Sequence, residues 1–247
     1  MEKVTVLCPI AESIPPLTFQ TALSVVGYAA KNGVGIEYIG VTERSLVDTA
    51  RNTLAREFLK TPSEWSFWMD ADMVLPKETI VQLLKTAKEK NVKMVTGVYY
   101  QRGRKHWPVC WIRESKTESG KEIQHEHKDE YNANEYLGMY AMPGPEAKEP
   151  FEANTSGFGC CLIHRSVFET LEEPYFQFIN GKCSEDFYFF VNARKKGFKL
   201  LADPSLRIGH IGSSVVVYRE TCYEKMKADK TILEPVSFNG AAQVVRD

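Results

Sequence analysis

The residues with the clearest chemical potential are two carboxylates, Asp70 and Asp72, at the end of a short apolar run that begins at Trp65. A run this rich in aromatic residues is typical of a strand buried on both faces, where acids are out of place. Because side chains two apart on an extended chain point the same way, both carboxylates could face one divalent cation and the phosphates it carries. The alternative is a pair of solvated acids at a turn, since an Asp-x-Asp pattern alone is common.

A second acidic pair, Glu185 and Asp186, lies in the first turn of a predicted helix that Ser184 caps and Gly197 ends. Acids in a first turn interact favourably with the helix dipole by about 0.3 to 1 kcal/mol each. Helix stabilisation alone would therefore explain this pair, and a chemical role needs support from elsewhere in the chain.

Three other polar residues are candidates for a site. Arg51 and Asn52 fall on the second turn of a helix predicted over residues 45–60, and a surface salt bridge is the alternative for Arg51. His210 stands between two glycines, with little side-chain packing to account for it, so it is either structural or a ligand. His125 and His127 flank one acid in a polar stretch and lack further metal ligands nearby, so we interpret them as solvated loop residues.

The elements that must position these residues alternate between strand and helix. Strands are predicted over residues 3–9, 35–42, 65–69 and 92–100, with helices over 17–31, 45–60 and 77–90 between them. This order predicts an α/β fold with a mainly parallel, twisted sheet and helices on both faces. Ligands bind beyond the carboxyl ends of such strands, so the strand ends at residues 9, 42–43, 70–72 and 99–102 should share one rim.

Composition limits the class of protein. The 247 residues carry 31 basic and 32 acidic side chains, a formal net charge of −1, which gives no support for a nucleic-acid-coating surface. No run is long and apolar enough for a membrane span and the start has no signal-peptide layout, so a cytoplasmic location is expected. The six scattered cysteines indicate reduced thiols, and the loop at residues 10–16 lacks the glycine-rich phosphate motifs.

Residues 101–151 form a polar stretch with weak periodicity, punctuated by glycines and prolines. It is too long for a plain connection and is typical of a lid or binding loop. Its aromatic residues could stack on sugars or bases, or could equally pin the loop to the core; they are Trp107, Trp111, Tyr131 and Tyr136.

Six short motifs in order give the chain a family resemblance. They lie at residues 6–9, 50–52, 69–72, 156–159, 184–187 and 209–210. Together they resemble the GT-A fold glycosyltransferases, which are Rossmann-like, and most nearly the family 2-like group of phages and bacteria. The resemblance covers about residues 3–212 and does not account for the insertion at 101–151 or the C-terminal tail. We predict a catalytic domain at 1–218, with residues 101–151 as an acceptor or lid insertion, and a C-terminal extension at 219–247.

The resemblance implies a metal-dependent enzyme that moves a sugar from a UDP- or GDP-type nucleotide-sugar to a hydroxyl acceptor. It places Asp72 and His210, with Asp70, on Mn²⁺ or Mg²⁺, and Asp70 also near the ribose. Asp186 would be the general base and Glu185 an acceptor or sugar contact, although a helix N-terminus should weaken that base. The remaining implied nucleotide contacts are Pro9, Ile10, Glu43, Arg51, Asn52 and Ala71.

Two other functions stay open at this stage. A sugar nucleotidyltransferase would share the sheet and the metal chemistry, but the loop at residues 10–16 has no glycine where that family carries a glycine-rich loop with an arginine. A non-catalytic nucleotide or carbohydrate binder would not need both acidic pairs and His210. The sugar, the stereochemical outcome, the acceptor (a nucleic acid among the possibilities) and the oligomeric state are left undecided by the sequence.

Overall fold

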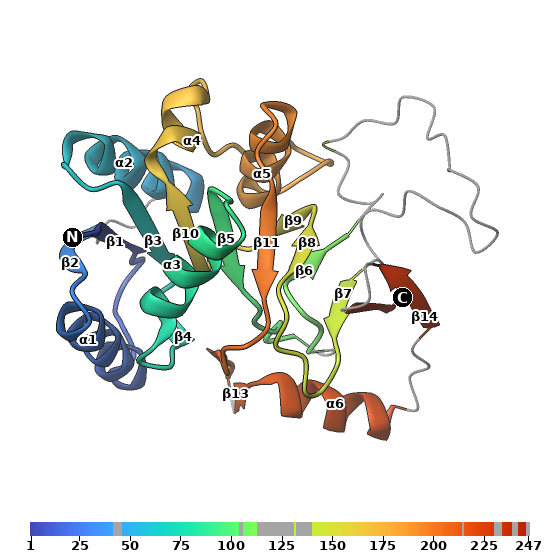
Figure 1. The fold of residues 1–247 in the computed structure, drawn as a ribbon. Coiled ribbons are helices and arrows are strands. Elements are labelled where there is room, and N and C mark those ends of the chain that lie inside the picture. Colours follow the sequence, from blue (N-terminus) through green and yellow to red (C-terminus); the bar gives the residue numbers. More distant parts are fainter. Residues whose placement is uncertain are drawn as a thin grey trace.

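The computed structural model describes residues 1–41, 46–103, 106–112, 131, 140–213, 215–229, 234–238 and 242–245. A seven-stranded sheet forms its centre, in the order β2-β1-β3-β10-β5-β11-β8 (Figure 1). The strands of this sheet are β1 (Lys3–Pro9), β2 (Gly35–Val41), β3 (Trp65–Met69), β5 (Met94–Gly97), β8 (Phe151–Ala153), β10 (Cys160–His164) and β11 (Leu200–Asp203). The helices are α1 (Pro16–Lys31), α2 (Val47–Lys60), α3 (Thr79–Glu89), α4 (Arg165–Thr170), α5 (Glu185–Lys195) and α6 (Arg219–Ala228).

The sheet is mainly parallel, as predicted. β2, β1 and β3 pair in parallel, and so do β5 and β11. β10 is inserted antiparallel between β3 and β5, and β8 is antiparallel at the edge. β1, β3 and β5 therefore end at the same side of the sheet, as predicted for the rim at residues 9, 70–72 and 99–102; residues 42–43 of that rim lie outside the described residues.

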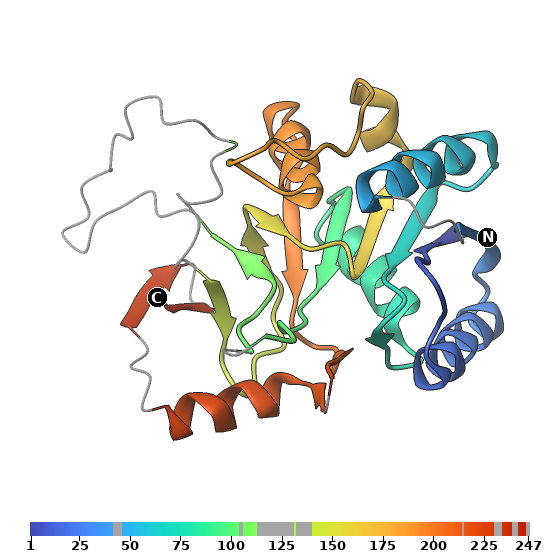
Figure 2. The same ribbon diagram turned by 180° about the vertical axis from the view of Figure 1, so that it is seen from behind.

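Helices cover both faces of the sheet, because neighbouring strand residues feed two separate cores. Trp68 of β3 packs with α2, α4 and α5 in one core, whereas Phe67 packs with α1 and α3 in the other. Figure 1 views the sheet from the side of α3, and Figure 2 shows it from behind. The alternation of side chains along buried strands produces this two-sided packing.

The ends of the insertion and the C-terminal segment form a second sheet together. Its order is β14-β15-β7-β6-β9, with β6 (Cys110–Trp111), β7 (Tyr140–Pro143), β9 (Thr155–Ser156), β14 (Glu234–Phe238) and β15 (Ala242–Val245). β15 pairs with β7 along four residues, so the chain end lies against the insertion (Figure 2). The division at residue 218 into a catalytic domain and an extension stays a prediction.

Two aromatic residues of the insertion pin it to the core. Trp107 and Trp111 are buried, and the Trp111 ring lies 5.0 Å from that of Phe187 on α5. Tyr131 stacks on Tyr188 of the same helix, with ring centroids 5.6 Å apart. Tyr136, His125 and His127 lie outside the described residues. These aromatics therefore pack against the core, and their stacking on a sugar or base stays a prediction.

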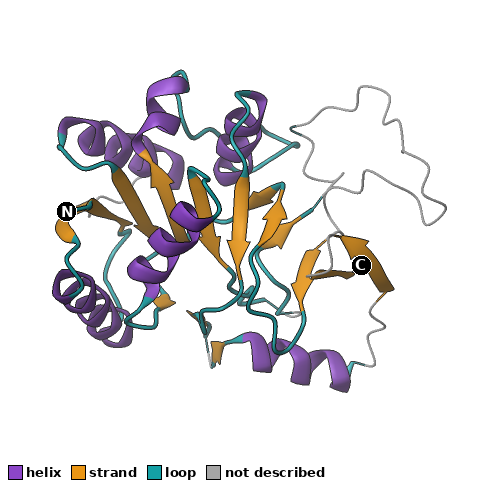
Figure 3. Cartoon of the chain, in the orientation of Figure 1, coloured by secondary structure: helices purple, strands orange, loops and turns teal. Residues whose placement is uncertain are grey.

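A third, three-stranded sheet joins distant segments beside the rim (Figure 3). β4 (Met73–Val74) directly follows residues 70–72, called the acidic turn below. β12 (Gly209–Ile211) pairs with β4 and with β13 (Val216–Val217). The Ile211 amide donates to the Asp72 carbonyl at 2.9 Å. This pairing carries His210 to the acidic turn.

None of the helices formed by the described residues has the length and apolar character needed to cross a bilayer.

The two glycines before β10 fit a close crossing with Tyr99. A Cβ added at Gly157 would lie 2.7 Å from Val109 Cγ1 and would also collide with the Tyr99 hydroxyl. The Gly159 amide donates to that same hydroxyl at 3.1 Å. The two glycines therefore leave room for a tyrosine of this chain.

We expect Gly157→Ala to lower the free energy of unfolding by about 1 to 3 kcal/mol, because a methyl group here overpacks a closed site. Chemical denaturation measures the change. Gly27→Ala is the matched control, since nothing lies within 4 Å of its added Cβ and alanine favours a helix by about 1 kcal/mol. Equal stability of the Gly157 variant and the wild type would contradict the close crossing.

Candidate active site

A cavity of about 600 Å³ opens at the carboxyl ends of β1 and β3. Its volume is in the range of sites for small-molecule ligands. It contains seven of the residues predicted for the site, drawn from the β1–α1 loop, α2, the acidic turn and β12. These residues are Pro9, Ile10, Arg51, Asp70, Ala71, Asp72 and His210.

Arg51 joins the two acidic pairs. Its side chain is 5% exposed, and its guanidinium donates to Asp70 Oδ1 at 2.9 Å and to Glu185 Oε1. It also lies 5.2 Å from the centre of the Phe158 ring. Burial lowers the pKa of Arg51, but Asp70, Glu185 and Asp186 outweigh burial and raise it overall. Arg51 is thus a buried ion-pair centre, not the surface salt bridge that was the sequence-based alternative.

One guanidinium cannot neutralise three carboxylates, and the pKa values of the second acidic pair reflect this. Burial raises the pKa of Glu185 to about 7; repulsion from Asp186 adds to the shift and Arg51 opposes it. Burial also raises the pKa of Asp186, against the opposing effects of Arg51 and of hydrogen bonds from Ser184 and Phe187. The lowering of the carboxylate pKa expected at a helix N-terminus is therefore outweighed at Asp186 by desolvation.

Ser184 holds the predicted cap position of α5 but uses its hydroxyl differently. Its Oγ donates to Asp186 Oδ1, and the Phe187 amide donates to the same oxygen at 2.8 Å. The serine side chain accepts no capping hydrogen bond from the helix. The serine therefore orients Asp186, and Gly197, with φ of +88°, follows the helix end as predicted.

Asp72 faces away from Arg51, toward His210 and Arg102. His210 Nε2 lies 3.5 Å from Asp72 Oδ1, and Arg102 Nη1 lies 2.6 Å from Asp72 Oδ2. Burial raises the pKa of Asp72, but His210, when its ring is protonated, and Arg102 lower it overall. The two acids of the turn thus have separate partners. Residues 71–72 form a turn and not an extended strand, so the side-chain alternation that predicted a shared direction does not apply.

The orientation of His210 suits a metal ligand. Its Nδ1 lies 2.8 Å from the Tyr100 carbonyl oxygen, which can only accept, so Nδ1 carries the hydrogen. In the neutral ring, Nε2 then presents a lone pair toward Asp72 Oδ1. That oxygen is buried and has no hydrogen-bond partner among the described residues. An unprotonated imidazole nitrogen facing an unpaired carboxylate oxygen is a donor set that fits a divalent cation.

The other predicted residues are placed as follows. Three of them do not line the cavity: Asn52, Glu185 and Asp186. Asn52 Nδ2 donates to the Phe176 carbonyl at 2.7 Å, and its Oδ1 accepts from the Phe176 amide at 3.1 Å. Asn52 thereby fixes the segment before α5 on α2. Glu43 lies outside the described residues.

Sequence reasoning did not select Arg102 as a site residue. It lines the cavity, pairs with Asp72 and is 54% exposed at the side chain. The available signal was its place just past the end of the strand 92–100, on the predicted rim. Basic side chains are common at such rims, so position alone did not distinguish Arg102; its contact with Asp72 in the folded chain does.

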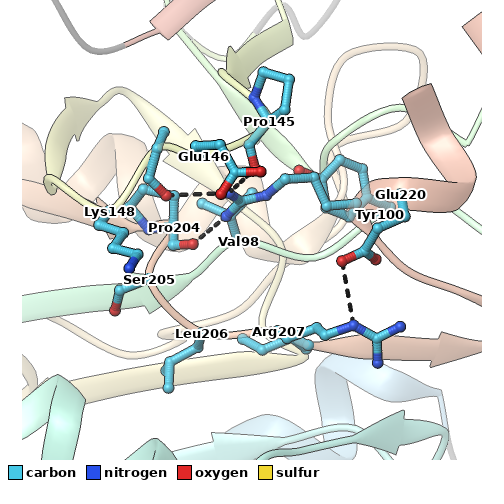
Figure 4. Close-up of a pocket in the computed structure, with 13 residues that line it drawn as sticks. Val98, Tyr100, Pro145, Glu146, Lys148, Pro204, Ser205, Leu206, Arg207 and Glu220 are labelled. Carbon is cyan, nitrogen blue, oxygen red and sulfur yellow. Dashed lines mark hydrogen bonds and ion pairs between the residues drawn. The ribbon is translucent and has the colours of Figure 1, made fainter.

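A smaller cavity of about 90 Å³ lies between β5, the segment after β7 and α6 (Figure 4). Arg219 binds main-chain carbonyls there, with Nη1 at 3.1 Å from Pro145 and 3.0 Å from Ala147. Arg207 Nε lies 3.2 Å from Glu220 Oε1 at its edge (Figure 4). These contacts attach α6 to its neighbouring loops, so we interpret this cavity as a structural joint.

The chain is similar in fold to solved structures of low sequence identity. A crystal structure of A197 from STIV matches with a TM-score of 0.57 at 20% identity, covering 90% of this chain and 92% of that one. GalNAc-T7, a glycosyltransferase crystallised with UDP, GalNAc and Mn²⁺, matches with a TM-score of 0.51 at 13% identity. That match covers 92% of this chain and 48% of GalNAc-T7. At these identities the likeness shows the fold alone.

No family model matches the sequence, and no curated protein sequence matches it.

We expect Arg51→Met to lower the free energy of unfolding by about 3 to 5 kcal/mol, because it leaves buried carboxylates without their counter-charge. Urea denaturation at pH 7 measures the loss. Arg56→Met on the same helix is the control: its ion pair with Glu173 is exposed, so its loss should be at most about 1 kcal/mol. Similar losses in the two variants would contradict a buried ion-pair centre.

The raised pKa of Glu185 predicts a pH dependence of stability. Between its ordinary value of 4.5 and about 7, the folded state binds more protons at this residue than the unfolded state. The contribution of Glu185 to the free energy of unfolding should therefore fall as pH rises through this range. Comparing the wild type with Glu185→Gln across pH 4.5 to 7 isolates that contribution from other titrating groups. The free energy of unfolding of the wild type minus that of Glu185→Gln should become smaller as pH rises. A value that stays constant or becomes larger would refute the prediction.

Proposed function

We propose that this chain is a metal-dependent glycosyltransferase that moves a sugar from a UDP- or GDP-type nucleotide-sugar to a hydroxyl acceptor. The observation that carries the proposal is the pairing of Asp72 Oδ1 with His210 Nε2, 3.5 Å apart, at the edge of a cavity of about 600 Å³. The fold shared with a glycosyltransferase supports it. Fold alone does not imply function, so the proposal depends on these side chains.

The proposed cation would be bound by Asp72 and His210 and would share its other positions with the donor phosphates and water. No group of three His, Cys, Asp or Glu side chains suited to a metal occurs in the described part of the chain. Mg²⁺ in phosphate sites is commonly bound through one or two carboxylates plus substrate phosphates, and an imidazole ligand favours Mn²⁺. When bound, the cation would act as a Lewis acid that stabilises the departing diphosphate.

Asp70 has a different proposed role from Asp72. Its Oδ1 is held by Arg51 at 2.9 Å, on the inner wall of the cavity. A carboxylate fixed in this way is suited to accept a hydrogen bond from a ribose hydroxyl. We therefore assign Asp70 to the nucleoside and leave metal binding to Asp72 and His210, although the sequence had grouped all three.

The proposed base is Asp186, with Glu185 as its supporting neighbour. The hydrogen bonds from Ser184 and Phe187 use Asp186 Oδ1, so Oδ2 would take the proton of the acceptor hydroxyl. A raised pKa makes a carboxylate a better base near neutral pH. Glu185 is tied to Arg51, which suits a positioning role more than proton transfer.

The proposal predicts that Asp72→Asn loses the metal-dependent part of nucleotide binding. In titration calorimetry with UDP and GDP, the variant should bind at least about tenfold more weakly than the wild type when Mn²⁺ is present. Without Mn²⁺ the two proteins should bind about equally. Release of nucleoside diphosphate from a panel of nucleotide-sugars should also stop.

Asp229→Asn is the control, because Asp229 pairs with Lys225 on exposed surface and should behave as wild type. Unchanged metal-dependent binding in the Asp72 variant would refute the metal assignment. Binding of nucleotide-sugars by the wild type without any release of nucleotide would instead identify a non-catalytic binder.

A further inference from the structure

The cavity contains two arginines in very different states. Arg51 is 4% exposed and is held by two carboxylates. The Arg102 side chain is 54% exposed, and among the described residues it forms an ion pair with Asp72. Only the second is poised to exchange its partner for a ligand.

We propose that Arg102 is the diphosphate-binding residue of this site: its guanidinium leaves Asp72 and binds the phosphates when a nucleotide enters with its cation. The inference rests on the proposed function and adds a residue and a ligand group to it. Arginine suits this task because its planar fork of N–H donors matches phosphate oxygens in pairs.

The charge balance of the cavity supports this assignment. The acidic lining residues are Glu12, Asp70 and Asp72. Arg51 is committed to Asp70 and, outside the lining, to Glu185. Among the described lining residues the carboxylates outnumber the arginines, and of the two arginines Arg102 is the one exposed enough to turn toward a diphosphate. The acidic surroundings would otherwise repel the ligand.

The partner exchange requires little energy from the protein itself. The Arg102–Asp72 ion pair is partly exposed on both sides, and such pairs contribute about 1 kcal/mol or less. A cation between Asp72 and His210 would draw on the same carboxylate and repel the guanidinium at 2.6 Å from it. Binding of the cation and nucleotide would thus weaken the Arg102–Asp72 ion pair and offer the guanidinium phosphate oxygens in place of the carboxylate.

The position also fits the proposed reaction. When the bond between the sugar carbon and the β-phosphate oxygen breaks, the electron pair goes to that oxygen, while the acceptor oxygen bonds to the sugar carbon and its proton goes to Asp186. A guanidinium on the β-phosphate would stabilise the charge that develops there. A nucleoside monophosphate lacks the β-phosphate, so Arg102 should favour nucleoside diphosphates over monophosphates.

The test is Arg102→Gln, with Arg207→Gln as the matched control because Arg207 is also half-exposed and pairs with a single acid, Glu220. Calorimetry with the intact chain would compare Mn²⁺ alone, and then UDP, GDP, UMP, GMP and inorganic pyrophosphate in the presence of Mn²⁺. We expect Arg102→Gln to bind the diphosphates and pyrophosphate about 10- to 100-fold more weakly. Monophosphate binding should change less than about threefold, and Mn²⁺ alone should bind as well as before or more tightly.

Equal losses for monophosphates and diphosphates, or no loss for diphosphates, would overturn the assignment. Weaker binding of Mn²⁺ alone would also overturn it, since Arg102 would then be supporting the metal site. Wild-type protein that binds no diphosphate in a Mn²⁺-dependent way would refute the proposed function and this inference together. If the wild type binds UDP or GDP in a Mn²⁺-dependent way and Arg102→Gln binds them equally well, the assignment of Arg102 fails and the proposed function stands.

Discussion

The buried guanidinium of Arg51 is the constraint on which the rest of the site depends. It ties α2 to the end of β3 through Asp70 and to the start of α5 through Glu185. Removing a charge from water costs several kcal/mol, and the cost is offset only while both carboxylates stay in contact. The aromatic core supports the arrangement, because Phe158 packs under Arg51 and also against Trp68. The inner wall of the cavity is therefore fixed by the core of the fold.

The outer wall is built by different means and is correspondingly open. Asp72 owes its neighbour His210 to the short pairing of β4 with β12, and its neighbour Arg102 to the segment that follows β5. Arg102 is exposed and the Asp72 and His210 side chains are partly exposed, so water can reach this wall. In the proposed function, the fixed inner half would orient the nucleoside and the exchangeable outer half would bind the charged phosphates.

The insertion and the chain end contribute to the same architecture from the other side. They share the second sheet, and Trp111 packs on Phe187 one residue after Asp186. The helix that presents the second acidic pair is therefore held by the core on one side and by the insertion on the other. A fold that is shared with proteins at 20% and 13% identity keeps its framework through apolar packing, whereas the chemistry depends on a few polar side chains.

The sequence by itself determined the elements and their class, because strand and helix periodicities are local properties of the chain. Residues 65–69 and 94–97 became strands, and 185–195 a helix, close to where the patterns predicted them. Tertiary structure alone decided the partners of each charge. The turn at residues 71–72 separates Asp70 from Asp72, burial makes Arg51 an ion-pair centre and raises the pKa of Glu185, and a distant strand brings His210 to Asp72. Desolvation and contacts between distant residues exist only in the folded chain, so no local pattern could have specified them.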